Sequence, residues 1–498
     1  MKPRFVFMVM VTVLVGTACS SGSTAANDAS PRPPTPAARA KPPAGPAARV
    51  VGRLTGGNGI NLPSGAGTPV PKTGWVEDEF AVEGTATSYR SDAELPTNGR
   101  FALIEDAAAD YRTRIVVRRP ATPAKFNGTV VVEWLNVSGG LDAGPDFTYA
   151  SNELVRGGYA WVGVSAQRIG IEGGPVAVRI EAAIAAGAGK GLRANDPARY
   201  GGLHHPGDAF SYDMFTQVAR ALRAPKASNV LGSLRPDRIL AVGESQSAFA
   251  LTTYVNGVQP ITRAFDGFLI HSRGGAAAPL GLPDAGIDIA STVGGKPTKL
   301  RTDLRAPILV VETETDLLGF LNNYPARQPD TASIRQWEMA GTAHADAYLI
   351  GAIADQIGCP TPTNAGPGHF IVSAALHHLN TWVRDGTAPP TAPRLEIDTT
   401  PAFVRDDVGN AKGGIRTPLV DAPVDTLSGE AAGGSVACLL FGSTTPLTAA
   451  QLHARYPTRQ AYVDAYRTAT DAAIKAGFVL AADRAELLEA ADPSRIAP

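Results

Sequence analysis

The sequence predicts an α/β fold in which a mostly parallel central sheet is covered by helices on both faces. Short apolar runs of strand type recur between residues 114 and 339, and they alternate with segments of helical spacing. Strands that alternate with helices form parallel sheets, whose strands are buried on both faces. One of these runs leads directly into a tight turn with a serine at its centre, and a helical segment begins after that turn.

The turn reads Gly243-Glu244-Ser245-Gln246-Ser247 and follows the apolar run at residues 239–242. A strand, a sharp turn and a helix place one serine at the apex, which is the arrangement of a nucleophile elbow. Because such a turn is strained, the residues two before and two after the serine must be small, and Gly243 and Ser247 are small. We interpret Ser245 as a catalytic nucleophile. The alternative is an ordinary strand-to-helix turn capped by Ser245.

The other elements are predicted in chain order around this turn. We expect an irregular, glycine-rich, cap-like insertion at residues 170–208, and a C-terminal helical extension within 448–490. No clear linker precedes this extension, so residues 49–495 are predicted to form one domain. The predicted strands are 114–117, 129–135, 159–164, 239–242, 265–270, 307–311 and 334–339, and the predicted helices of the core are 149–156, 209–224 and 370–384.

Composition narrows the class of protein. A chain of 498 residues can bury at least one large core. The formal net charge of −1 implies neither nucleic acid nor an anionic membrane surface as a partner. No Cys/His cluster has the spacing of a zinc site, so neither a metal nor a cofactor is predicted.

The N-terminus has the pattern of an export signal. Residues 1–19 combine two basic residues, an apolar stretch too short to be a good membrane span, and a lipobox-like site ending at Cys19. We expect Cys19 to be lipidated, with cleavage near Ala18 of a plain secretory signal as the alternative. Residues 20–48 should be a disordered Ser/Ala/Pro tether. Both alternatives predict an extracytoplasmic protein, secreted or attached to the cell surface, that contacts the membrane only through a lipid anchor.

The two remaining cysteines are Cys359 and Cys438. An even pair in an exported protein is typical of a disulfide, which we predict here. Two buried free thiols are the alternative.

A serine hydroxyl needs a base to accept its proton, and the base needs a partner to orient it. In the elbow enzymes these residues follow the serine in the order acid, then histidine. His344 lies in a loop of small residues after the last predicted core strand, and we interpret it as the base. His369, which precedes a helix, is a second candidate.

The acid should follow the strand at residues 307–311, where Glu312, Glu314 and Asp316 are clustered. Asp316 stands at the expected offset after the strand and a short turn, and we choose it. Glu314 is the alternative acid, whereas Glu312 directly continues the strand and is the weakest candidate. A solvated turn residue or a helix N-cap is the structural alternative for Asp316.

An oxyanion hole requires two N–H donors aimed at the developing charge. We expect one from the backbone of Gln246, which the elbow fixes. The other should come from the loop at Asn136 and Val137, after the strand at residues 129–135. A tight structural turn is the alternative explanation for this loop.

Five stretches resemble one bacterial family described as alpha/beta hydrolase domain-containing, and the resemblance spans most of residues 50–490. It implies an α/β-hydrolase fold and a serine nucleophile but supplies no substrate. The stretches are V-V-V-E-W-L-N-V-S-G-G, D-P-A-R-Y-G-G-L-H-H-P-G-D, V-G-E-S-Q-S-A, V-E-T-E-T-D and A-C-L-L-F-G-S-T-T-P-L.

These features together predict a serine hydrolase, and we expect a carboxylesterase that acts on a small or lipid-like ester through an acyl-enzyme. An acyltransferase with the same triad is a second hypothesis. A non-catalytic, hydrolase-like binding protein at the cell surface is a third, against which the presence of Ser245, Asp316 and His344 argues.

Overall fold

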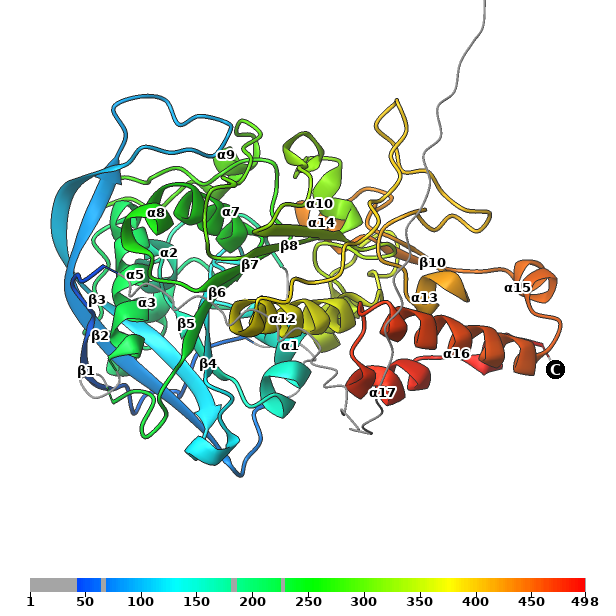
Figure 1. The fold of residues 1–498 in the computed structure, drawn as a ribbon, viewed down its shortest axis with the longest axis horizontal. Coiled ribbons are helices and arrows are strands. Elements are labelled where there is room, and N and C mark those ends of the chain that lie inside the picture. The colour runs from blue at the N-terminus through cyan, green and yellow to red at the C-terminus, as the bar shows by residue number, and fades with distance from the viewer. Residues whose placement is uncertain (1–42, 64–68, 181–185, 225–228, 498) are drawn as a thin grey trace, which may run out of the picture. The chain divides into compact units, whose positions relative to one another are not determined.

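A nine-stranded sheet runs through the residues that the computed structural model describes, namely 43–63, 69–180, 186–224 and 229–497 (Figure 1). The strand order is β1-β2-β3-β5-β4-β6-β7-β8-β9. From β5 to β9 all neighbours are parallel, and β1, β2 and β3 add an antiparallel end. The predicted mostly parallel sheet is confirmed. Its strands are β1 (Arg49–Arg53), β2 (Trp75–Arg90), β3 (Ile104–Pro120), β4 (Thr129–Trp134), β5 (Ala160–Val164), β6 (Arg238–Glu244), β7 (Gly267–His271), β8 (Ile308–Glu312) and β9 (Ile334–Glu338).

Helices cover both faces of the parallel strands. Figure 1 shows α5 (Ser211–Arg223) and α7 (Gln246–Thr253) on the opposite side of the sheet from α1 (Pro145–Arg156) and α12 (Gly368–Asp385). Each pair belongs to its own apolar cluster with the strand side chains of that face. In α12, the residues Ile371, Ala375, Leu379 and Val383 recur every fourth position and are all buried, which is why this segment is helical and faces the sheet.

The antiparallel end of the sheet is larger than the sequence predicts. β2 was not expected, and β3 extends ten residues before the predicted strand at 114–117. Buried ion pairs explain how polar residues enter this region. Arg114 of β3 is fully buried and binds Glu79 of β2 at 3.0 Å and Asp142 at 2.7 Å.

The N-terminal predictions fall mostly on residues that the structure does not describe. The signal segment, Cys19 and the tether up to residue 42 lie outside the described residues. Residues 43–48 belong to the predicted tether, yet Ala48 is buried and donates its backbone N–H to the carbonyl oxygen of Gln217. The folded part therefore begins slightly before the predicted boundary at residue 49.

The described part of the predicted cap at residues 170–208 lies mainly beside β2. In its described part, the short helices α2 (Arg168–Glu172), α3 (Gly191–Asn195) and α4 (Pro197–Tyr200) pack together beside β2. The reason is apolar contact: Leu192, Tyr200 and Leu203 are buried against Ala81 of β2. The described residues of the insertion that reach the candidate site are Val178 and Ile180.

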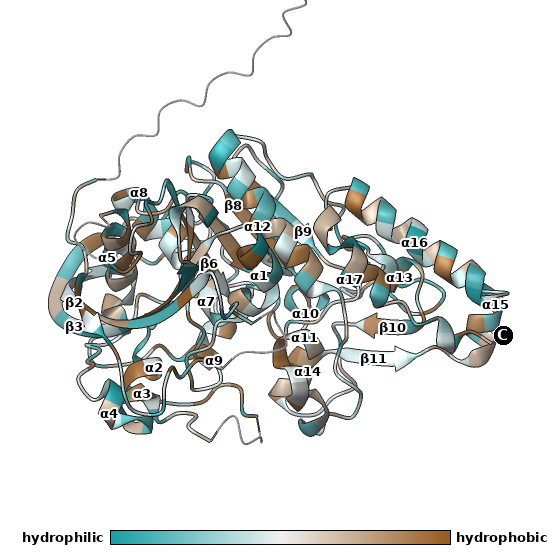
Figure 2. Cartoon of the chain, turned by 90° about the horizontal axis from the view of Figure 1, so that it is seen from below, coloured by the Kyte–Doolittle hydropathy of each residue, from teal (hydrophilic) through white to brown (hydrophobic). Residues whose placement is uncertain are grey.

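The C-terminal region is helical, as predicted, and it also contains a small two-stranded sheet. The buried residues of α16 are Tyr462, Tyr466, Thr470 and Ala473, which share one face, and Figure 2 shows polar residues repeating along the rest of this helix. The elements here are β10 (Asp425–Ser428), β11 (Ser443–Pro446), α13 (Pro418–Asp421), α14 (Val436–Phe441), α15 (Ala449–Arg455), α16 (Arg459–Lys475) and α17 (Arg484–Glu489).

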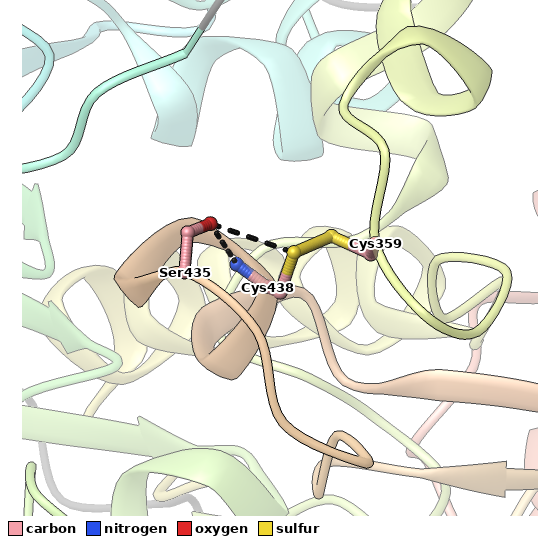
Figure 3. Close-up of a disulfide and its surroundings, with 3 residues drawn as sticks. All are labelled: Cys359, Ser435 and Cys438. Carbon is pink, nitrogen blue, oxygen red and sulfur yellow. Dashed lines mark hydrogen bonds between the residues drawn. A yellow bond between two sulfur atoms is a disulfide. The ribbon is translucent and has the colours of Figure 1, made fainter.

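A disulfide between Cys359 and Cys438 joins α14 to the chain between α11 (Ala347–Ile350) and α12 (Figure 3). It is the predicted pair, and it closes a loop of 79 residues. Ser435 caps α14 by accepting the backbone N–H of Cys438. Of the helices within the described ranges, none has both the length and the hydropathy needed to span a bilayer.

Candidate active site

Ser245 stands at the junction of β6 and α7 with φ 58° and ψ −121°. A positive φ is strained for a residue with a side chain, and such strain is concentrated at functional sites. Gly243 and Ser247 must be small, as expected, because they pack closely against each other. A Cβ atom at Gly243 would lie 3.0 Å from the Cβ atom of Ser247 and 3.0 Å from Leu251 Cδ1. The turn therefore has the geometry of a nucleophile elbow.

The structure brings Ser245, His344 and Asp316 together as one hydrogen-bonded chain. His344 Nε2 lies 2.7 Å from Ser245 Oγ, and His344 Nδ1 lies 2.6 Å from Asp316 Oδ1. His344 follows β9, and Asp316 lies in the short helix α10 (Glu314–Leu317) after β8. Both side chains are buried. The three residues thus come from the C-terminal ends of three strands at the same edge of the sheet.

Asp316 is held in place by the start of its own helix. Its Oδ2 accepts the backbone N–H of Thr313 at 2.6 Å and the hydroxyl of Thr313 at 2.7 Å. This capping arrangement leaves Oδ1 to accept the N–H of His344 Nδ1. The carboxylate is therefore oriented before any substrate binds.

Glu314, the alternative acid, has a different role in the structure. Its Oε1 accepts the backbone N–H of Gly341 at 2.6 Å, and its Oε2 accepts the N–H of Gly429 at 3.0 Å. The carboxyl group thus joins the start of the His344 loop to the C-terminal region. Because His344 bonds to Asp316, the alternative assignment of Glu314 as the acid is not supported by this geometry.

His369, the second candidate base, lies elsewhere. Its ring stacks on Tyr348 with centroids 3.8 Å apart, and its Nε2 lies 3.5 Å from Glu486. The imidazole that contacts Ser245 is that of His344.

The charge environment favours the protonated form of His344. Burial lowers its pKa, but the Asp316 carboxylate, its hydrogen bond and the nearby Glu244 outweigh burial, so the pKa lies above the ordinary value for histidine. A histidine whose protonated form is stabilised in this way is well suited to accept a proton from a hydroxyl group.

The predicted oxyanion loop, which begins with Asn136 and Val137 after β4, differs in one detail from the prediction. The N–H of Asn136 is donated to the carbonyl oxygen of Ala143 at 2.9 Å, and Asn136 in turn accepts the N–H of Ala143. Asn136 therefore has no N–H to offer to an oxyanion, which corrects this assignment. Among the described residues, no acceptor is found for the N–H groups of Val137 and Gln246. They remain the candidate donors, and Gln246 is the first residue of α7, where an N–H has no partner within the helix.

A second carboxyl group lies beside the predicted base. Glu244 immediately precedes Ser245, is buried, and places Oε1 3.4 Å from His344 Nε2. The side chain of Asn136 donates to the backbone oxygen and to Oε2 of Glu244, both at 3.1 Å. Sequence reasoning did not single out Glu244 because its contacts lie about 100 residues away along the chain. Its position within the elbow was the one available signal.

A buried His271–Asp146 pair was also missed. His271 ends β7, and its Nδ1 lies 2.9 Å from Asp146 Oδ1 at the start of α1. Burial lowers the pKa of His271, yet the hydrogen bond and charge of Asp146 more than compensate, so its pKa is raised. His271 also interacts electrostatically with Glu244 and Asp316.

A pocket of about 210 Å³ opens onto Ser245 and His344. Its walls are mostly apolar, and among the described residues Glu244 and His344 are the titratable side chains that line it. Asn136, Ser138 and Gly139 of the oxyanion loop form part of the wall. The apolar lining includes Val178, Ile180, Leu349, Ile350, Leu440 and Phe441. This lining is suited to uncharged, apolar groups beside Ser245.

A family model for the alpha/beta hydrolase domain matches residues 42–489. The chain belongs to the alpha/beta hydrolase domain family. The predicted α/β-hydrolase fold is thereby confirmed, and the match extends through the C-terminal helices.

Solved structures with similarity to the chain include hydrolases at very low sequence identity. One of two fungal esterases from Rhizomucor miehei is 9% identical, with 62% of this chain and 85% of that chain covered and a TM-score of 0.30. A serine hydrolase without a lid from Xanthomonas campestris is 11% identical, with 56% and 88% covered and a TM-score of 0.29. A serine hydrolase homologue from Coxiella burnetii is 12% identical, with 47% and 84% covered and a TM-score of 0.26. No protein of curated function matches the chain.

In this family member the disulfide lies next to the pocket wall. Leu349 and Ile350 of α11 form one part of the wall, and Leu440 and Phe441 of α14 form another. Cys438 belongs to α14, and Cys359 follows α11 by nine residues. The bond therefore links the two segments that supply this wall.

Within the described ranges, no three His, Cys, Asp or Glu side chains are grouped so as to hold a metal ion.

Proposed function

We propose that the protein is a serine hydrolase that cleaves carboxylic esters. The observation that carries this proposal is the chain Ser245–His344–Asp316, with contacts of 2.7 and 2.6 Å, at a strained elbow that faces an apolar pocket. In this proposal Ser245 is the nucleophile, His344 the general base and Asp316 the residue that orients the imidazole.

The proposed reaction follows from the order of these contacts. Ser245 Oγ attacks the ester carbonyl carbon while its proton passes to His344 Nε2. The N–H groups of Gln246 and Val137 stabilise the negative charge on the carbonyl oxygen. His344 then gives the proton to the leaving alcohol, and an acyl group remains on Ser245. Water repeats the sequence, with His344 again as base, and releases the carboxylic acid.

The pocket indicates the class of ester. Its apolar walls favour an uncharged, small or lipid-like group over a sugar or a charged group. Glu244 would also disfavour a substrate with an anion next to the ester, because like charges repel in a buried site.

An ester panel tests this function directly. The protein should hydrolyse p-nitrophenyl esters, and Ser245→Ala should lower kcat/KM by at least about a thousandfold. Ser247→Ala is a matched control, because it removes a buried hydroxyl of the same turn, and the described residues include no hydrogen-bond partner for its oxygen. Equal activity of Ser245→Ala and the wild type would refute the proposal.

We also propose that the protein is exported and held at the cell surface through lipidated Cys19, or is secreted. The motivation is the basic and apolar N-terminal pattern, together with the Cys359–Cys438 disulfide, since such bonds persist in oxidising compartments. Metabolic labelling with a palmitate analogue should modify the wild type but not Cys19→Ala. Recovery of the protein from the cytoplasm with an intact N-terminus would contradict export.

A further inference from the structure

Glu244 lies in the candidate site but is not one of the three residues of the proposed triad. Its carboxyl group faces the atom of His344 that exchanges the proton. Nε2 lies 2.7 Å from Ser245 Oγ and 3.4 Å from Glu244 Oε1. Asp316 Oδ1 lies 2.6 Å from the other ring nitrogen, His344 Nδ1. The imidazole of His344 therefore lies between two carboxyl groups, both of them buried.

The position of Glu244 is fixed from two sides. Glu244 is the last residue of β6, directly before Ser245, and Asn136 Nδ2 donates to both its backbone oxygen and its Oε2. With Oε2 bound to Asn136, Oε1 is the atom that faces His344. Asn136 thereby holds the carboxyl group at the base.

The surroundings of Glu244 supply charges of both signs. His271, with Asp146 at 2.9 Å, forms a second buried imidazole–carboxylate pair in the same region. The titratable groups that interact electrostatically with Glu244 come from several different elements: His344, His271, Asp146, Asp316 and Tyr149.

We propose that Glu244 is a positioning residue that stabilises the imidazolium form of His344 from the Nε2 side and thereby sets the pH at which the base becomes active. This inference rests on the proposed serine hydrolase function. No proton is transferred to Glu244 in the reaction. The serine proton moves to Nε2 and then to the leaving oxygen, while the Glu244 carboxylate lowers the energy of the intermediate imidazolium.

The titration of Glu244 is consistent with this role. Burial raises the pKa of Glu244 to about 7, in spite of the opposing influence of His344 and His271. Because Glu244 Oε1 lies 3.4 Å from His344 Nε2, the charge on either group influences the titration of the other. Loss of the Glu244 charge in mildly acidic solution would remove one of the two anions that support the base.

Glu244→Gln tests the inference, because it keeps the size of the side chain and an oxygen for Asn136 but removes the charge. A neighbouring anion raises the pKa of a histidine, so its removal should lower that pKa. The acid limb of kcat/KM against pH should move down by about one pH unit, and kcat on the plateau should fall by about tenfold with little change in KM. Glu244→Asp, which keeps the charge, should leave the limb near its wild-type position.

Glu314→Gln is the matched control. Glu314 is also a buried glutamate whose pKa burial raises to about 7, but it binds the N–H groups of Gly341 and Gly429 instead of His344. The acid limb of kcat/KM against pH for Glu314→Gln should coincide with that of the wild type. The inference is overturned if the limb of Glu244→Gln also coincides with the wild type, since a purely structural role would leave the limb unmoved.

Labelling by a fluorophosphonate separates this inference from the proposed function. A wild type that neither reacts with the probe nor hydrolyses esters would refute the function itself. A reactive wild type with an unmoved limb in Glu244→Gln refutes the inference alone. If Glu244→Gln does not fold, NMR titration of the His344 ring in the wild type decides. Two inflections support coupling to Glu244, and one inflection contradicts it.

Discussion

Ala345 donates its backbone N–H to the carbonyl oxygen of Leu440 at 3.1 Å. This bond connects the residue after His344 to α14, which belongs to the C-terminal region. Leu440 also lines the pocket, and Cys438 is two residues before it. The C-terminal region therefore forms part of the candidate active site, and the disulfide lies within one helical turn of a bond that fixes the His344 loop.

Removal of the disulfide should affect both stability and substrate binding. Cys438→Ser opens a loop of 79 residues, and the loss of a native disulfide costs about 2 to 5 kcal/mol. Because the bond joins the pocket segments at α11 and α14, KM for long-chain esters should rise more than KM for acetates. Thermal unfolding and kinetics with both ester lengths measure these effects. Two titratable thiols in the denatured, non-reduced wild type would show that no bond forms.

Asp316→Asn and Glu314→Gln should separate the two candidate acids. Asp316→Asn keeps the shape of the side chain but loses the charge that orients and stabilises the imidazolium, so kcat should fall by about 10⁴-fold. Glu314→Gln should mainly lower the melting temperature, because Glu314 accepts two backbone N–H groups. Steady-state kinetics and calorimetry of both variants provide the test. A larger loss of kcat in Glu314→Gln would transfer the role of the acid to that residue.

The wild type should lose activity in acid. A raised pKa means that His344 stays protonated to a higher pH than an ordinary histidine, and only the neutral ring can accept the serine proton. The profile of kcat/KM against pH should therefore fall as pH decreases through a value above about 6.5. A profile that is flat from pH 5 to 9 would be incompatible with His344 as the base.

The sequence could predict the elements whose signals are local. The elbow was recognisable because Gly243, Ser245 and Ser247 are close neighbours, and α12 because its apolar residues recur at helical spacing. The residues that were missed depend on partners far along the chain. Glu79 of β2 follows Glu77 and Asp78, and nothing in this local sequence indicates that it is buried. Its burial is explained by Arg114 on β3 and by Arg199 and Tyr200 in α4.

In the candidate site, too, local signals could be read from the sequence, whereas contacts between residues far apart in the chain could not. Ser245, Asp316 and His344 each follow a strand, so their convergence could be inferred from chain order. Whether Asn136 offers an N–H could not be inferred, because its partner Ala143 is set by the fold of the loop. The contact between Glu244 and His344 was likewise outside the reach of local patterns.

A bulky residue in the pocket should change the preferred ester. Ile350 lines the pocket at α11, away from the hydrogen bonds of Ser245 and His344. Ile350→Trp should fill part of the space of about 210 Å³ and lower kcat/KM for an octanoate ester by at least about tenfold relative to an acetate. A comparison of the two esters for the variant and the wild type measures this shift. An unchanged ratio would place the acyl chain elsewhere.

The most direct measurement of the central claim is the site of covalent modification. The purified protein should be treated with a fluorophosphonate, digested and examined by mass spectrometry, with Ser245→Ala treated in parallel. We predict one adduct per chain, on the peptide that contains Ser245, and none in the variant. An adduct on another residue, or equal labelling of Ser245→Ala, would contradict the assignment of Ser245 as the nucleophile.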